Sequence, residues 1–153
     1  IMSDALKFIL DHPEFPRGKC WEEVEFAPDA IILKEGETSC DVYLITSGVV
    51  RINMGVDVSP NQHLESGLME MTHGDTFGEL NLFCKSDRAA SVVALSQTNA
   101  IRIDGVRLTA FMDRYPELGY PVLKNFFVKH ADMLRTAKER LSSLYADKLR
   151  HND

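Results

Sequence analysis

The chain has 153 residues, with 17 Lys or Arg against 23 Asp or Glu, which gives a formal net charge of −6. A hydrophobic fraction of 44% and a charged fraction of 26% are typical of one globular domain with a buried core, so a two-domain enzyme is not expected. The acidic balance argues against a nucleic-acid-binding surface, because neutralising phosphates requires a clustered excess of basic residues.

Cysteine content and hydropathy predict a cytoplasmic protein. Cys20, Cys40 and Cys84 are odd in number and widely spaced, which indicates neither a disulfide framework nor a cysteine metal site. Apolar runs of four or five residues fall far short of the ~20 that span a bilayer, and no secretion signal begins the chain. We therefore expect no membrane span.

The first 18 residues predict a short helix followed by a break. Leu6, Ile9 and Leu10 share one helical face behind Ser3 as a candidate cap. Two prolines and a glycine within residues 12–19 then end the segment.

From residue 21 the pattern changes to short strands separated by turn residues. Residues 41–46 and 49–54, around Ser47 and Gly48, are interpreted as a hairpin. The polar stretch 55–66 is interpreted as an exposed loop, because it is rich in turn residues.

A second group of strands follows. Residues 68–71 resume a strand, and residues 91–95 and 100–103 are interpreted as another strand pair. About eight short strands at close spacing imply a mainly β fold, a β-barrel or jelly roll.

After Asp104 the hydrophobic period becomes helical. One helix stops before Pro116, and Pro121 suits the first turn of a second, longer helix of about 28 residues, ~42 Å long. Because a small barrel cannot cover that length, part of this helix is expected to meet a partner; packing of its whole apolar face on the barrel is the alternative. The coiled-coil seam pattern comprises Leu123, Phe127, His130, Leu134, Ala137, Leu141, Leu144 and Lys148.

One segment between the two groups of strands has the residue types of an anion site. Residues 78–82 begin with a glycine and are helix-compatible, and Arg88 follows Glu79 by nine residues. Backbone N–H groups of a short helix, together with a guanidinium and small residues at Ala89 and Ala90, suit a phosphate. The carboxylate of Glu79 suits a sugar hydroxyl. From composition alone, a surface ion pair between Glu79 and Arg88 is the alternative.

These residues closely resemble the phosphate-binding cassette of the cyclic nucleotide-binding domain family. The family pattern, Phe-Gly-Glu-Leu-Ala-Leu and then Pro-Arg-Ala-Ala before Thr or Ser, stands here at residues 77–82 and 88–91 with the same spacing. The resemblance covers roughly residues 20–145. Further matching residues are Gly36, Glu37, Asp41, Tyr43, Leu44, Ile45, Gly48, Val50, Leu108, Phe111, Tyr115, Pro116, Glu117 and Leu118.

The resemblance implies a double-stranded β-helix (jelly-roll) barrel with a short N-terminal helix and C-terminal helices, the last one long. We expect an N-terminal helical segment at residues 1–18 and a β-roll at 19–106 that contains the cassette at 77–91. Residues 107–153 are expected to form the lid and dimerisation helices.

By the same resemblance, Arg88 would bind the cyclic phosphate with backbone N–H groups of Ala89 and Ala90, and Glu79 would accept from the ribose 2′-hydroxyl. The expected ligand contacts are Phe77, Gly78, Glu79, Leu80, Arg88, Ala89, Ala90 and Ser91. The candidates for a lid over the base are Arg135, Thr136 and Lys138.

The resemblance implies a regulatory sensor that signals through its cassette and C-terminal helix and is not an enzyme. Ala89, where the kinase branch of the family has threonine in cyclic GMP sites, favours cyclic AMP over cyclic GMP. No other cofactor and no metal are expected.

Two departures from the family pattern bear on affinity. Asn81 replaces an alanine and is expected to alter the sugar contacts, and Asp87 replaces the proline before Arg88. Two charges ~6 Å apart at an effective dielectric of 20 interact by roughly 3 kcal/mol, so Asp87 would weaken phosphate binding. A degenerate barrel that binds no ligand and acts as a dimerisation or scaffold domain is therefore the alternative.

Other site types lack the residues they need. The five histidines form no His-x-His pair, which argues against a metal-dependent cupin, and three cysteines cannot hold a four-cysteine iron–sulfur cluster. Haem would leave Glu79 and Arg88 unexplained. His73 is expected in a solvated loop, and His130 is expected to be packed or interfacial.

The expected partners are the cyclic nucleotide, a second copy bound through the long helix, and a downstream protein. Because the chain ends at Asp153, a few residues beyond the long helix, no DNA-binding domain is expected within it. A stand-alone sensor and an excised domain both fit this length.

Overall fold

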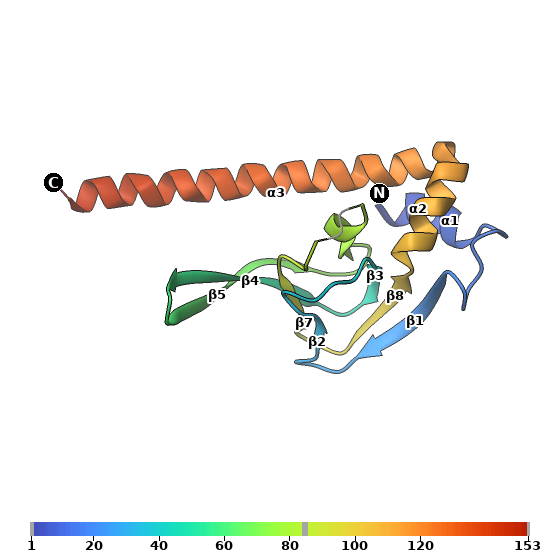
Figure 1. The fold of residues 1–153 in the computed structure, drawn as a ribbon, viewed down its shortest axis with the longest axis horizontal. Coiled ribbons are helices and arrows are strands. Elements are labelled where there is room, and N and C mark those ends of the chain that lie inside the picture. The colour runs from blue at the N-terminus through green and yellow to red at the C-terminus, as the bar shows by residue number, and fades with distance from the viewer. Residues whose placement is uncertain (1, 84–85, 153) are drawn as a thin grey trace.

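A computed structural model describes residues 2–83 and 86–152, which form two antiparallel sheets and three α-helices (Figure 1). The helices are α1 (Met2–Leu10), α2 (Gly105–Arg114) and α3 (Pro116–His151). A single 3-10 turn, η1 (Glu79–Asn81), lies within the cassette.

Each sheet has four strands, and consecutive strands of the chain often belong to different sheets. The first sheet has the order β1 (Trp21–Phe26), β8 (Thr98–Ile103), β3 (Val42–Ser47), β6 (Thr76–Phe77). The second has the order β2 (Ile31–Leu33), β7 (Ser91–Ala94), β4 (Val50–Ser59), β5 (Gln62–Met71). This arrangement confirms the predicted mainly β jelly-roll fold with flanking helices.

Both predicted strand pairings are wrong. β3 pairs with β6 and β8 whereas β4 pairs with β5 and β7, so residues 41–46 and 49–54 do not form a hairpin. Gly48, with φ 95°, carries the chain between the sheets, and a Cβ there would lie 2.4 Å from the carbonyl oxygen of Gln97. Likewise, β7 and β8 lie in different sheets. A turn residue between two apolar runs therefore marks a crossing as readily as a hairpin.

The predicted exposed loop at residues 55–66 is also wrong. β4 and β5 form one long hairpin whose register runs from Val50 opposite Met71 to Ser59 opposite Gln62. Only Pro60 and Asn61 lie between the two strands. Cross-strand backbone hydrogen bonds satisfy this segment, and a polar composition does not prevent them.

The C-terminal helices form where the sequence predicts them, except that α3 begins earlier than expected. α2 stops at Arg114, as predicted, but α3 begins at Pro116, so Pro121 lies inside the helix and not in its first turn. A proline this close to the start removes only one intrahelical hydrogen bond, and the burial of Val122 and Phe126 in the following turns supports the helix. With 36 residues, α3 is ~54 Å long.

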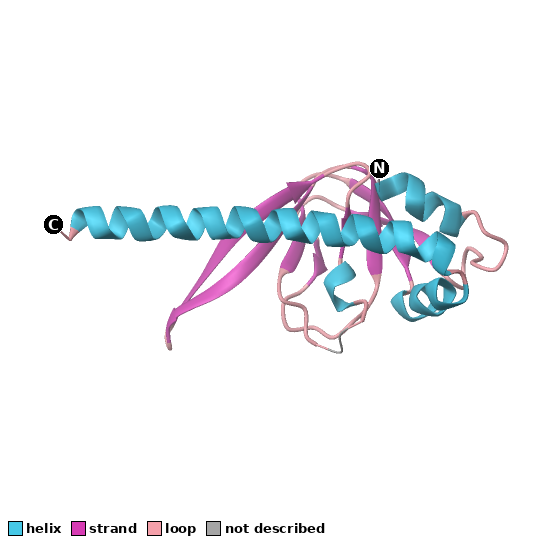
Figure 2. Ribbon diagram, turned by 90° about the horizontal axis from the view of Figure 1, so that it is seen from above, coloured by secondary structure: helices cyan, strands magenta, loops and turns pink. Residues whose placement is uncertain are grey.

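The core consists of two clusters, one inside the barrel and one beneath the helices. The barrel cluster centres on Tyr43, Val50 and Phe77. The helical cluster joins Ile9 of α1 to α2 and to the first turns of α3. Beyond these turns α3 extends past the barrel (Figure 2). The seam residues Leu134, Leu141 and Leu144 are exposed. Packing of the whole apolar face on the barrel is therefore wrong.

Among the described residues, no helix is long and apolar enough to cross a bilayer.

Candidate ligand-binding site

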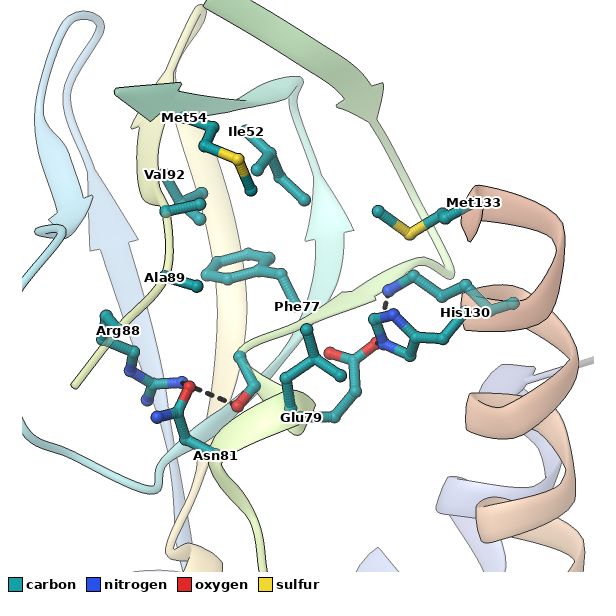
Figure 3. A pocket seen from close by; sticks show the side chains of 14 residues that line it. Ile52, Met54, Phe77, Glu79, Asn81, Arg88, Ala89, Val92, His130 and Met133 are labelled. Carbon is teal, nitrogen blue, oxygen red and sulfur yellow. Dashed lines mark hydrogen bonds and ion pairs between the residues drawn. The ribbon is translucent and has the colours of Figure 1, made fainter. Parts of the chain in front are cut away.

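A cavity of about 120 Å³ lies between the cassette, strands β4 and β7, and α3 (Figure 3). Seven of the eight expected ligand contacts line it, the exception being Ser91. The lining residues are Ile52, Met54, Phe77, Gly78, Glu79, Leu80, Asn81, Arg88, Ala89, Ala90, Val92, Lys129, His130 and Met133.

The turn into the cassette depends on Gly78. Its φ is 89°, and a Cβ there would lie 2.6 Å from the carbonyl oxygen of Asp41, so no larger residue fits without movement. Just before it, Phe77 stacks on Tyr43 with ring centroids 4.9 Å apart and an interplanar angle of 4°. The start of η1 is therefore fixed against β3.

Glu79 is a buried carboxylate, 6% exposed, whose two oxygens differ. Oε1 accepts from Nζ of Lys129 at 2.5 Å, from Nε2 of His130 at 3.1 Å and from Oγ1 of Thr76 at 3.4 Å. Oε2 is also buried, but it has no hydrogen-bond partner among the residues that the structure describes. A buried acceptor without a donor is costly, so this oxygen is free to accept a hydrogen bond from a ligand.

The charge of this carboxylate is stabilised by α3. Burial alone would raise the pKa of Glu79, but the hydrogen bond from His130 and the charge and hydrogen bond of Lys129 lower it to about 2. Glu79 is therefore ionised at neutral pH. It follows that Nε2 of His130 carries the proton of that hydrogen bond.

Arg88 is 3% exposed, and its guanidinium points into the protein. Nε and Nη2 donate to Oγ of Ser39 at 3.2 and 2.7 Å, and Nη2 also donates to the carbonyl of Asp41 at 2.8 Å. Nη1 donates to the carbonyl of Gly78 at 2.6 Å and to Oδ1 of Asn81 at 3.4 Å. Five contacts match the five N–H donors of a guanidinium. Burial lowers the pKa of Arg88, with partial compensation from Tyr43 and Asp41, but a guanidinium stays protonated.

Within the described parts of the chain, the partners of Glu79 and those of Arg88 do not include each other, and both side chains are buried. The alternative of a surface ion pair between them is therefore wrong.

The two departures from the family pattern have different surroundings. Asn81 is buried and donates from Nδ2 to the carbonyl of Ser86 at 2.6 Å, so its side chain ties η1 to the segment that leads to Arg88. Asp87 is exposed and accepts from Oγ1 of Thr38 at 2.9 Å. The Asp87 carboxylate is thus exposed and pairs with Thr38, whereas the Arg88 guanidinium is buried.

Ser91 and the three candidates for a lid over the base lie outside the cavity. Oγ of Ser91 accepts from the backbone N–H of Glu35 at 3.0 Å. Arg135 pairs with Asp132 at 2.9 Å on the exposed surface of α3, and Thr136 and Lys138 are exposed as well. Their role over a bound base stays a prediction.

Sequence reasoning missed the part of α3 that does line the cavity, namely Lys129, His130 and Met133. His130 packs against Glu79, which is one of its two expected surroundings, and His73 is exposed in a turn, as predicted. The helical periodicity contained a signal, because positions 129, 130 and 133 share one helical face with the apolar Phe126. The apolar contributions of β4 and β7 were also missed, because strand pairing alone brings them to the cassette.

The fold and the site define a β-roll domain with a pocket whose lining combines a buried carboxylate, a buried guanidinium and apolar side chains. The sequence profile of the cyclic nucleotide-binding domain matches residues 23–115. The chain belongs to this family, which confirms the resemblance.

Two curated relatives and one solved structure illustrate the similarity. Cyclic GMP-binding protein C of Dictyostelium discoideum is 32% identical over 124 residues, which are 79% of this chain and 5% of that protein. The CRP-like cAMP-activated global transcriptional regulator of Mycobacterium tuberculosis is 28% identical over 103 residues, 67% of this chain and 44% of that protein. The chain thus spans less than half the length of both relatives.

The solved structure is a cyclic nucleotide-binding domain from Methylobacillus flagellatus, with a TM-score of 0.69 and 22% identity over 80% of this chain and 66% of that one. This likeness supports the fold. The names of the two curated relatives mention different nucleotides.

Proposed function

We propose that this domain is a regulatory sensor that binds a 3′,5′-cyclic nucleotide in the cavity and transmits binding through α3. One observation carries the proposal: Oε2 of Glu79 is buried and has no partner among the described residues, in a cavity that Arg88 also lines. A ribose 2′-hydroxyl is the donor that this oxygen needs.

The phosphate belongs at the other polar end. Neither the N–H of Ala89 nor that of Ala90 has a hydrogen-bond acceptor within residues 2–83 and 86–152, so both are available to an anion. Arg88 adds the permanent charge, after exchanging one of its internal acceptors for a phosphate oxygen. Between the two ends, Phe77 and Val92 offer an apolar surface to the base (Figure 3).

The preferred nucleotide is cyclic AMP. Ala89 has no hydroxyl to pair with the additional polar groups of guanine, and most other side chains around the base position are apolar, including Ile52, Met54 and Met133. Unpaired polar groups on a buried base reduce affinity, so cyclic GMP binds more weakly.

The output is regulatory and not catalytic, and it passes through α3 in the cytoplasm. Lys129, His130 and Met133 bring this helix to the cavity wall, while its distal half exposes Leu134 and Leu141. A second copy covers that distal stripe, so nucleotide binding changes how two copies, or one copy and a downstream protein, are held.

A barrel without a ligand is the less favoured function. Two buried ionised groups, Glu79 and Arg88, serve no purpose in a scaffold, where apolar residues of similar volume would be at least as stabilising.

Isothermal titration of the wild-type chain with cyclic AMP and cyclic GMP tests the proposal. We expect cyclic AMP to bind more tightly, and Glu79→Gln and Arg88→Lys each to weaken binding about tenfold or more, because each loses a charged hydrogen bond. The exposed residues Glu25 and Arg140 provide the matched controls Glu25→Gln and Arg140→Lys. If neither nucleotide binds below about 100 μM to the folded protein, the scaffold function replaces this one.

A further inference from the structure

The five hydrogen bonds of the Arg88 guanidinium are unequal. Nη1 donates to the carbonyl of Gly78 at 2.6 Å, and Nη2 donates to Oγ of Ser39 at 2.7 Å and to the carbonyl of Asp41 at 2.8 Å. The contact from Nη1 to Oδ1 of Asn81, at 3.4 Å, is the longest of the five. Hydrogen bonds from nitrogen weaken beyond about 3.2 Å, so Asn81 is the acceptor whose loss costs Arg88 least.

The amide of Asn81 is fixed with its oxygen toward Arg88. Asn81 is buried, 7% exposed, and its Nδ2 donates to the carbonyl of Ser86 at 2.6 Å. Turning the amide over would bring Oδ1 against that carbonyl, and two acceptors cannot share a hydrogen bond. Asn81 therefore presents an acceptor, and not an N–H donor, to the guanidinium.

A phosphate and Asn81 need the same donor. Of the two side chains that accept from Arg88 within the described residues, Ser39 is not part of the cavity lining, whereas Asn81 is. Figure 3 shows Asn81 beside the Arg88 guanidinium, at the end of the cavity where Ala89 lies. A phosphate bound at this end gains a charged hydrogen bond from Arg88 only where an internal acceptor gives way.

We propose that Asn81 lowers the affinity of the site for its nucleotide by competing with the phosphate for Nη1 of Arg88. Asn81 is a positioning residue, because it acts through the guanidinium and holds this group in its internal arrangement. The proposal rests on the proposed function, since it requires a phosphate at the N–H groups of Ala89 and Ala90.

Two substitutions shift this competition in opposite directions. Asn81→Ala removes Oδ1, and the Ser86 carbonyl that loses its donor belongs to an exposed residue, where water replaces the bond. Asn81→Asp keeps the shape of the side chain and gives the competing acceptor a negative charge. We expect Asn81→Ala to tighten the binding of cyclic AMP about three- to tenfold, and Asn81→Asp to weaken it by at least as much.

Isothermal titration with cyclic AMP and with adenosine tests the proposal. Adenosine keeps the base and the 2′-hydroxyl but has no phosphate, so Asn81→Ala should change its affinity by less than about twofold. This difference separates competition for Arg88 from a general change in the shape of the site. The proposal is overturned if Asn81→Ala binds cyclic AMP no tighter than the wild type, if adenosine gains as much, or if Asn81→Asp binds cyclic AMP more tightly.

A further variant covers a failure of Asn81→Ala to fold. In Asn81→Ser the hydroxyl is one bond closer to the backbone than Oδ1 and does not reach Nη1, so it should tighten cyclic AMP in the same way. Asn152 is exposed at the end of α3 and provides the matched controls Asn152→Ala and Asn152→Asp, which should bind like the wild type.

The outcomes separate the two proposals. If neither the wild type nor the Asn81 variants bind a cyclic nucleotide, the proposed function fails and the competition fails with it. If Asn81→Ala binds and the wild type does not, the competition holds and the proposed function fails for the natural chain. If the wild type binds, but Asn81→Ala and Asn81→Ser bind no tighter, only the competition is overturned.

Discussion

The two halves of α3 form one continuous helix but have opposite surroundings. The proximal half buries Val122 and Phe126 and places Lys129 and His130 against Glu79. The distal half, from Leu134 onward, is exposed along its whole length, with Leu134 72% exposed. The same apolar spacing thus serves the core in one half and remains unpartnered in the other. Helical periodicity shows that a face is apolar and not what covers it.

The largest expected effect on stability comes from the proximal half. Phe126→Ala removes a ring from the helical core and is expected to lower the free energy of unfolding by about 3–5 kcal/mol. Urea denaturation followed by circular dichroism measures it. The adjacent Phe127 is 77% exposed, so Phe127→Ala is a matched control within about 0.5 kcal/mol of the wild type. Equal losses from the two variants would contradict the assignment of the buried face.

The contact between α3 and Glu79 predicts acid sensitivity. The folded-state pKa of Glu79, about 2, lies below the ordinary 4.5. The ionised carboxylate therefore adds to the free energy of unfolding above about pH 4.5, and this stabilisation is lost as the pH falls toward 2. The difference between the two pKa values corresponds to on the order of 3 kcal/mol in the free energy of unfolding. Urea titrations from pH 6 to pH 2 should show a steeper loss for the wild type than for Glu79→Gln. Parallel curves would mean that Lys129 and His130 do not stabilise the carboxylate in solution.

A close approach between α2 and α3 predicts a smaller effect. A Cβ on Gly119 would lie 2.6 Å from Cβ of Met112, next to the backbone of α2, so Gly119→Ala has to separate the helices. We expect a loss of about 1–3 kcal/mol despite the better helix propensity of alanine. Thermal denaturation measures it, with the exposed Ser143→Ala as control. A gain in stability would show that the helices have room to move apart.

The smallest effect on the stability of one copy is expected in the distal half. Leu134→Glu changes an exposed position, so the free energy of unfolding should stay within about 0.5 kcal/mol. The oligomer mass from light scattering should fall, because a charge in an apolar helical seam opposes association. Thr136→Glu, off the seam on the same turn, should leave the mass unchanged. An unchanged mass for Leu134→Glu as well would remove the proposed helical contact.

What the sequence predicted well is local in the chain. The cassette residues from Phe77 to Ala90 are nearly contiguous, so their spacing alone identifies the pocket wall. α1 and α2 were predicted for the same reason, since caps, prolines and apolar periodicity act within a few residues. The start of α3 was misplaced by one proline, because both Pro116 and Pro121 satisfy the same local rule.

What failed depends on contacts between distant parts of the chain. The turn at Gly48 has the residues of a hairpin, and only the arrangement of the two sheets around the barrel cluster turns it into a crossing. In the sequence, Lys129 and His130 look like ordinary polar helix residues. Only the docked helix brings them to Glu79, which lies some 50 positions earlier in the chain.

The sequence by itself thus determined the family, the strand-rich barrel and the two charged residues of the cassette, because those properties are encoded by short-range patterns. Only the tertiary structure decided that Arg88 is fully paired within the protein and that α3 holds one oxygen of Glu79. It also showed the other oxygen to be without a protein partner among the described residues. Burial and hydrogen-bond satisfaction are properties of the packed chain, and no local pattern specifies them.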